Sequence, residues 1–448
     1  MTSEQSADNP LDTEQFTTIS INDLIVGRTN QHAIYDQSGI LLLAGNSEIT
    51  QERKLAILQR GCLEIRVNCL DSKRISFNRE LLQRNYALLE LDTEVTRKLD
   101  AIIEGGLFEF KNEGPAVKQT LLDAGRKGYD KAQREEVIKQ HLQNGQELEE
   151  MISGVIHGET INGARVSRMA TQYLEAMTKD VGNVLSSIIH QFSDDEIASR
   201  SIEVALMAMS IGIEMNLDAR NARLLAIAGL VHDWGMTKVP QQIRTATKRL
   251  NESEMLEIKK HPIHSLEMIQ RVSGMPKVIS LIAYQVHERM NGMGYPRGRK
   301  GKSIHPLARI LQVADAFVGM TSTRPYRAPM MRYAAMECLI RQARENFVDA
   351  EVVRAFLKVQ SLFPIGSYVL LSDDSVAQVI RRNQDFYTQP IVMRVQDASG
   401  ELVDQEADIN LIDLHAEDKM NIVRALPNPG TNETNYSEDK YYSKLIVN

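Results

Sequence analysis

Five of the ten histidines in this 448-residue chain lie between residues 231 and 327, and carboxylates stand among them. Imidazole and carboxylate groups are the ligands that iron, manganese and zinc bind in proteins. The candidates are one His-Asp pair, two later histidines and a final carboxylate: His232, Asp233, His261, His287 and Asp315. Their types and spacing predict a metal site.

Apolar residues precede or surround these candidate ligands in the sequence. Residues 226–231 lead into the His-Asp pair, and Asp315 lies inside the apolar run 310–318. A carboxylate in such a run is costly to bury unless it is paired or bound to a cation. For a single residue of this kind, a buried salt bridge or a helix cap is the commoner explanation. The whole set, in this order, favours metal binding.

The window resembles the HD-GYP family, a branch of the HD metal-dependent phosphohydrolases, over about residues 190–360. The matching residues are His232-Asp233, His261-Pro262, His287-Glu288-Arg289, Gly292, Gly294-Tyr295-Pro296, Asp315 and Arg324-Pro325-Tyr326-Arg327. The long Gly-Tyr-Pro segment makes this match far more specific than a lone His-Asp pair. The resemblance implies an all-helical domain that hydrolyses the bacterial second messenger cyclic di-GMP.

The resemblance also implies roles for these residues. Asp233 would bridge two metals, with His232 and Asp315 on one and His261 and His287 on the other. The cofactor would be a divalent metal, Fe or Mn, as one or two ions. Two metals would polarise the phosphoryl oxygen, supply the nucleophile and stabilise the leaving oxygen. Catalysis is assigned to Asp233, His232 and Lys238, and substrate binding to Arg324, Arg327 and Tyr295.

Several family positions differ in this chain. They are Arg200 for a histidine, Val286 for a histidine, Met236 for a lysine, Asn291 for an aspartate and Val318 for an acid. Val286 continues an apolar stripe with Val278 and Ile282, which is typical of a helix core. Arg200 has two interpretations. It either pairs with Glu196 on a helix surface, or it occupies a metal position and neutralises Asp233 and Asp315.

Two functions of different classes follow. The first is a metal-dependent phosphodiesterase that acts on cyclic di-GMP, or on a related nucleotide. The second is a catalytically degenerate relative that binds a nucleotide or a protein partner without turnover, as the ligand losses suggest.

The Gly-Tyr-Pro loop, residues 291–303, is rich in glycine and basic residues and is predicted to be exposed. Tyr295 and Pro296 on this loop are candidate contacts for a protein partner.

Composition narrows the class of protein. The chain is 43% hydrophobic and 25% charged, which is typical of globular domains, and its net charge of -7 gives no support for nucleic-acid binding. The three cysteines, Cys62, Cys69 and Cys338, form no metal or redox spacing, which fits a reduced cytoplasm. No signal peptide and no membrane span are recognised. We therefore expect a cytoplasmic protein.

The predicted fold is mainly α, an HD-type helical bundle with small β-rich modules at both ends. The expected order is a disordered tail at 1–15, a β-rich module at 16–77, a helical connector at 78–190, an HD-GYP-like domain at 191–363, a β appendage at 364–426 and a flexible tail at 427–448. The connector could transmit a signal or form a homodimer. Asp218 is predicted to cap the helix before His232, and residues 251–254 to open the helix that presents His261. Residues 33–43 are predicted to form a hairpin and Thr50 to cap a short helix, and residues 368–371, 376–380 and 391–395 are predicted strands of the appendage.

Overall fold

The computed structural model describes residues 15–24, 28–76, 93–105, 108, 111–122, 128–188, 197–247, 250, 252–325, 327–383, 385–405, 407–417 and 419–435. The chain divides into two compact units, with the change near residue 88. Most of the predicted tails, and Glu196, lie outside the described residues.

The first unit is a small β-rich module, as predicted. Its four-stranded sheet has the order β1-β4-β2-β3, with β1 Phe16–Ser20, β2 Ile34–Asp36, β3 Leu41–Leu43 and β4 Glu64–Asn68. Two helices, α1 Gln51–Gln59 and α2 Cys69–Ile75, accompany the sheet. Thr50 caps α1 by accepting a hydrogen bond from the Arg53 amide. Buried isoleucines from the sheet and from α1, such as Ile34, Ile57 and Ile65, form the core.

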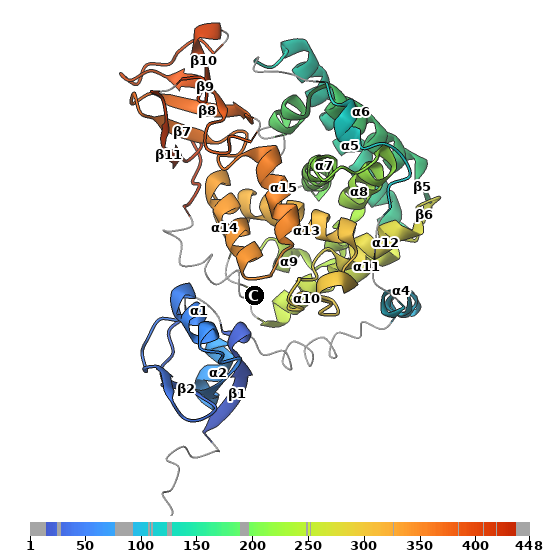
Figure 1. Ribbon diagram of the computed structural model, residues 1–448. Helices are drawn as coiled ribbons and strands as arrows, with labels where there is room; N and C mark the ends of the chain where they lie inside the picture. Colours follow the sequence, from blue (N-terminus) through green and yellow to red (C-terminus); the bar gives the residue numbers. More distant parts are fainter. Residues whose placement is uncertain are drawn as a thin grey trace, which may run out of the picture. The chain divides into compact units, whose positions relative to one another are not determined.

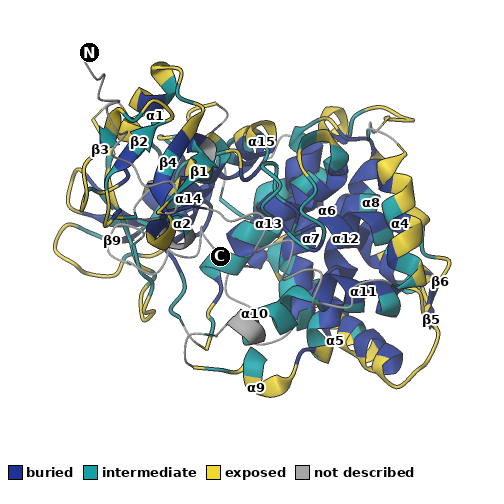
Figure 2. Ribbon diagram, turned by 90° about the horizontal axis from the view of Figure 1, so that it is seen from below, coloured by how far each residue is buried: buried dark blue, intermediate teal, exposed yellow. Residues whose placement is uncertain are grey.

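The second unit is built around helices α7 Ile197–Glu214 and α8 Ala219–Val231 (Figure 1). The helices that accompany them are α4 Glu94–Glu104, α5 Lys131–Ile156, α6 Ala164–Ser187, α9 Gln241–Arg244, α10 Glu252–Lys259, α11 His261–Ile269, α12 Lys277–Gln285, α13 Pro306–Thr321, α14 Arg332–Arg344 and α15 Ala350–Gln360. Gly229 of α8 lies against the backbone of Ala205 in α7, where a Cβ would overlap the Ala205 Cα. The two helices therefore cross at very short range, and both are buried on most sides (Figure 2).

Helices α5 and α6 belong to the same packed core, although they lie in the segment predicted as a connector. Both contact α7, and α6 also contacts α8. His141 of α5 is buried, with Nδ1 3.2 Å from the Tyr173 hydroxyl and Nε2 3.1 Å from the Ser187 hydroxyl. In the described part of the chain, no helix has the length and apolar character needed to cross a bilayer.

The C-terminal β appendage is a five-stranded sheet of order β10-β9-β8-β7-β11. Its strands are β7 Tyr368–Leu371, β8 Val376–Arg381, β9 Ile391–Gln396, β10 Leu411–Asp413 and β11 Ile422–Leu426. The sequence indicated the first three, but the short β10 and β11 were not recognised. Arg381 at the end of β8 binds Asp180 of α6 through two hydrogen bonds of 2.8 and 2.7 Å. This paired contact joins the sheet to the helical core.

Candidate metal centre

Helix α8 delivers the His-Asp pair to the interior. Asp218 caps its start by accepting from the Asn221 amide at 2.8 Å, as predicted from the sequence. At the other end the ring Nδ1 of His232 lies 2.8 Å from the Gly229 carbonyl oxygen. A carbonyl can only accept, so Nδ1 carries a proton, and in the neutral imidazole Nε2 presents its lone pair to the site. Both His232 and Asp233 are buried.

A proline positions His261. The helix expected to carry this histidine ends at Lys259, and His261 instead opens α11, so that prediction was wrong in detail. Pro262 has no amide proton and cannot donate to the Ile258 carbonyl four residues earlier, which breaks the helix there. The Ile258 carbonyl accepts from His261 Nδ1 at 2.7 Å instead. His261 Nε2 therefore also presents a lone pair.

His287 follows α12 and faces His261. Their Nε2 atoms are 2.8 Å apart, and the two rings meet edge to face. Tyr295 stacks on the His287 ring with centroids 4.8 Å apart, and its amide donates to the His287 carbonyl at 3.0 Å. Val286 is fully buried, in agreement with the apolar stripe inferred from the sequence.

Three donors converge where a cation would fit. Ligand atoms of Asp233, His261 and His287 all lie within 4.8 Å of one another, and Asp233 Oδ1 is 3.3 Å from His261 Nε2. If His287 keeps its proton on Nδ1, which faces Asp315 Oδ2 at 3.6 Å, both facing Nε2 atoms carry lone pairs. Two lone pairs and a carboxylate oxygen repel one another unless they share a cation. The donor set thus fits one divalent ion of the iron, manganese and zinc class.

The electrostatics keep the histidines of this group neutral and the aspartate charged. Burial and the neighbouring His261 lower the pKa of His287 to about 3, and burial lowers the pKa of His261. Burial alone would raise the pKa of Asp233, but the Arg200 guanidinium holds it below its usual range. Neutral imidazole and ionised carboxylate are the forms that bind metal.

Arg200 points at Asp233. The guanidinium Nη2 donates to Asp233 Oδ2, and both side chains are largely buried. Of the two interpretations of Arg200, the structure contains the contact with Asp233. Glu196, the partner in the other interpretation, lies outside the described residues.

Asp315 lies on α13 beside His232. Its Oδ1 is 3.6 Å from His232 Nε2, so it faces both His232 and His287. Burial would raise the pKa of Asp315, but the neighbouring His232 and His287 and the charge of Arg200 hold it far below its usual range. All five predicted metal ligands are therefore brought into one largely buried cluster.

The three predicted basic residues are engaged elsewhere. Lys238 pairs with Glu267 at 2.7 Å, and both side chains are 42% exposed. Arg327 donates to the carbonyl oxygens of Gly319 and Met320 at the end of α13, which holds the chain that follows this helix. Arg324 forms a backbone bridge with Arg327. None of these contacts reaches the metal group, so the roles of the three residues remain predictions.

The Gly-Tyr-Pro loop is less exposed than the sequence indicated. Gly294 and Pro296 are buried, and the peptide bond between Tyr295 and Pro296 is cis. Glu288, buried beneath the loop, accepts from the amides of Arg297 and Arg299 at 2.8 and 2.7 Å. Burial raises the pKa of Glu288 to about 8, although both amides oppose this. Through these two hydrogen bonds, Glu288, the neighbour of His287 in the sequence, holds the loop folded back over His287.

Helix α4 holds the outer side of the same loop. Asp100 accepts from Arg297 Nε at 2.9 Å, from Arg299 at 3.2 Å and from the Tyr284 hydroxyl at 3.3 Å. Thr96, Leu99 and Ile103 are the buried residues of this amphipathic helix. One carboxylate thus gathers two arginines of the loop and a tyrosine of α12.

Replacing Asp100 by Asn is expected to release α4 from the loop. Hydrogen bonds to charged groups contribute about 1.5–3 kcal/mol each, so the amides of residues 93–105 should exchange with solvent at least about tenfold faster. Hydrogen exchange followed by mass spectrometry measures this. Glu94→Gln, at an exposed position of the same helix, is the control. Equal exchange in the Asp100 variant would show that the carboxylate does not hold the helix.

Lys259 is a candidate site residue that was missed in the sequence. Its ammonium lies 5.8 Å from the centre of the Tyr295 ring, and Tyr295 stacks on His287. The side chain is partly buried, which lowers the pKa of Lys259, and it makes no ion pair with a described residue. Its position two residues before His261 was the available signal, but the direction of the side chain depends on the helix break at Pro262.

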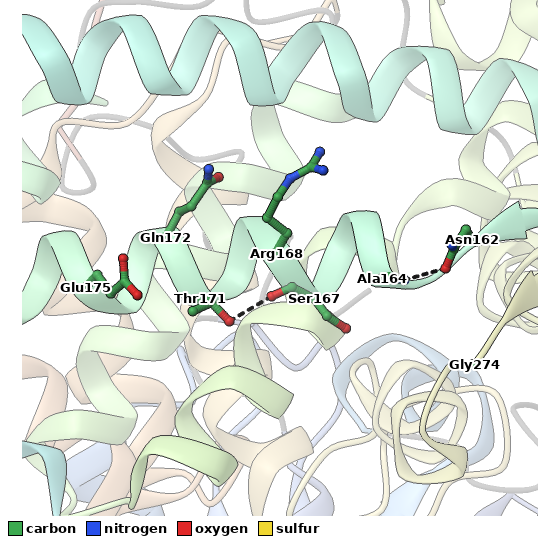
Figure 3. Close-up of a pocket in the computed structure, with 8 residues that line it drawn as sticks. All are labelled: Asn162, Ala164, Ser167, Arg168, Thr171, Gln172, Glu175 and Gly274. Carbon is green, nitrogen blue, oxygen red and sulfur yellow. Dashed lines mark hydrogen bonds between the residues drawn. The ribbon is translucent and has the colours of Figure 1, made fainter.

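A surface depression on α6 lies apart from this chemistry. Figure 3 shows its lining, which includes Arg168, Thr171 and Glu175 but none of the predicted site residues. Arg168 pairs with Glu147, and the Thr171 hydroxyl donates to the Ser167 carbonyl. These two side chains of the depression are thus paired locally, and we assign the depression no function.

Two known protein families match parts of the chain. Residues 166–352 match a family described as HD domain, and residues 368–431 match a family described as KOW domain associated with HD domain. The first match begins within α6, ahead of the boundary expected at residue 191. Proteins of the HD family are metal-dependent, and the chain contains a possible metal-binding group.

The relatives carry names from cyclic dinucleotide metabolism. The chain is 27% identical over half its length to a cyclic di-GMP phosphodiesterase, PA4108, of Pseudomonas aeruginosa, covering 54% of that protein. It is 35% identical to 3'3'-cGAMP-specific phosphodiesterase 1 of Vibrio cholerae over 34% of this chain and 35% of that protein. The matches thus span from about a third to about half of each relative. A solved HDG"Y"P protein, Bd1817 of Bdellovibrio bacteriovorus, aligns over 76% of this chain and 98% of its own, at 16% identity and a TM-score of 0.41.

Proposed function

Because the chain carries an HD domain of the HD-GYP type, we propose that it is a metal-dependent phosphodiesterase that hydrolyses a cyclic dinucleotide. Cyclic di-GMP is the first candidate substrate and 3'3'-cGAMP the second, because relatives are named for both. The observation that carries the proposal is the convergence of Asp233 Oδ1, His261 Nε2 and His287 Nε2 in a buried group.

The protein residues would bind and orient the substrate around one divalent ion. An ion held by Asp233, His261 and His287 would polarise the phosphoryl oxygen and lower the pKa of a bound water. The protons on Nδ1 of His232 and His261 are held by backbone carbonyls, which keeps both Nε2 atoms available. Tyr295 covers one face of His287 and limits access of bulk water on that side.

Lys259 would bind a phosphate of the substrate. Replacing Lys259 by Ala is expected to raise KM about tenfold or more with kcat less affected, because a charge-assisted hydrogen bond to the bound substrate is lost. Lys259→Arg should keep most of the affinity. Lys260→Ala is the control, since Lys260 is already paired with Glu257. A KM that is the same in the wild type and in Lys259→Ala would exclude this role.

The test is a turnover assay on the purified chain. Protein loaded with Mn²⁺ or Fe²⁺ under low oxygen is incubated with cyclic di-GMP and, separately, with 3'3'-cGAMP, and products are separated by chromatography. Linear dinucleotide or mononucleotide, absent after treatment with a chelator, supports the proposal. Metal-loaded protein that leaves both substrates intact contradicts it.

The second candidate is a non-catalytic binding module. The contact between Arg200 and Asp233 favours it, because a guanidinium on this carboxylate takes one of the two oxygens a metal could use. Calorimetry with cyclic di-GMP separates the two functions. Binding without product would assign the chain to the second.

A further inference from the structure

The donor atoms of the buried cluster fall into two groups that share Asp233. One group is Asp233 Oδ1 with the Nε2 atoms of His261 and His287. The remaining donors are Asp233 Oδ2 and the pair formed by His232 Nε2 and Asp315 Oδ1, which lie 3.6 Å apart; among the described residues these form no group as compact as the first. Each group offers nitrogen and oxygen ligands of the kind that binds a divalent ion.

A cation from the protein already occupies the second group. Arg200 Nη2 donates to Asp233 Oδ2, and the Arg200 side chain is only 14% exposed. Arg200 belongs to α7. Because α7 and α8 cross closely at Ala205 and Gly229, the side chains of Arg200 and Asp233 come within reach of each other. A guanidinium stays protonated in proteins, so this charge is permanent.

Two cations compete for one carboxylate oxygen. A divalent ion beside a guanidinium at about 4 Å, in a partly buried site, would be repelled strongly enough to weaken its binding by about a thousandfold or more. The first group has no such competitor among the described residues. The charges also balance better with one ion, since two carboxylates, one guanidinium and one divalent ion leave a single positive charge for a phosphodiester anion.

We propose that this chain binds a single divalent ion, at Asp233, His261 and His287, and that the Arg200 guanidinium takes the position of a second ion. The inference rests on the proposed function only for the identity of the site as a metal centre. Arg200 neutralises Asp233 and can direct its further N–H donors to a phosphate oxygen. It cannot activate a water, so any such activation falls to the single ion.

The experiment counts metal ions rather than turnover. Purified full-length chain is saturated with Mn²⁺, freed of excess metal and analysed by elemental analysis, together with Arg200→His and with Arg220→His as the surface control. We expect one ion per chain in the wild type and the control, and two in Arg200→His. Two ions or none in the wild type would overturn the proposal, and this count needs no variant to fold.

The Arg200→His variant tests separately whether the guanidinium excludes a second ion. A folded Arg200→His protein that still binds one ion would show that the guanidinium is not what excludes the second. Hydrolysis is measured separately on the same samples. One bound ion without turnover contradicts the proposed phosphodiesterase and leaves the single-ion centre standing, so the two failures are distinguishable.

Discussion

Asp233→Asn is expected to abolish metal binding and, with it, any hydrolysis. Asp233 Oδ1 belongs to the metal group and Oδ2 accepts from Arg200, so the neutral amide weakens both contacts. It also leaves a buried guanidinium without its charged partner, and removing one member of a buried ion pair costs about 3–5 kcal/mol. Elemental analysis measures the metal content, and urea denaturation measures the free energy of unfolding.

The control for this variant is Asp218→Asn at the start of the same helix. Asparagine caps helices as well as aspartate does. Since Asp218 also accepts from the amides of Glu113 and Gly114, a loss of about 1 kcal/mol is expected, with full metal content. If Asp233→Asn kept the metal content of the wild type, Asp233 could not be a ligand.

Gly235→Ala is expected to have the next largest effect. A Cβ on Gly235 would overlap the His261 carbonyl oxygen and the Ser265 amide nitrogen, both backbone atoms of α11. The short helix η3 Trp234–Lys238 and α11 must then move apart, at a cost of about 1–3 kcal/mol. His261 moves with α11, so the affinity for Mn²⁺ should fall by at least about tenfold.

Gly319→Ala is the matched control. Gly319 lies on α13, one turn after Asp315, and a Cβ there meets no atom within 4 Å. Alanine favours a helix over glycine by about 1 kcal/mol, so this variant should be neutral or more stable. Equal stability and metal affinity in the wild type and Gly235→Ala would show that α11 can adjust without moving His261.

Local patterns were sufficient for much of the fold. The hairpin at residues 33–43, the caps at Thr50 and Asp218, and the first three strands of the appendage depend on neighbours within a few residues. Strands β10 and β11 are short and carry no clear alternation of apolar residues, and pairing with the rest of the sheet defines them. The mainly helical class with β-rich ends is confirmed.

The candidate site likewise has features that the sequence predicted and features that only the tertiary structure revealed. The sequence alone determined the candidate ligand types, since His232, Asp233, His261, His287 and Asp315 stand in recognisable segments and lie in one largely buried cluster. Only the tertiary structure decided where the cations lie. Arg200 reaches Asp233 because α7 and α8 cross closely, Lys259 turns toward Tyr295 ahead of the helix break, and Asp100 binds arginines almost 200 residues away. Pairings of this kind depend on the packing of distant helices, which no local spacing encodes.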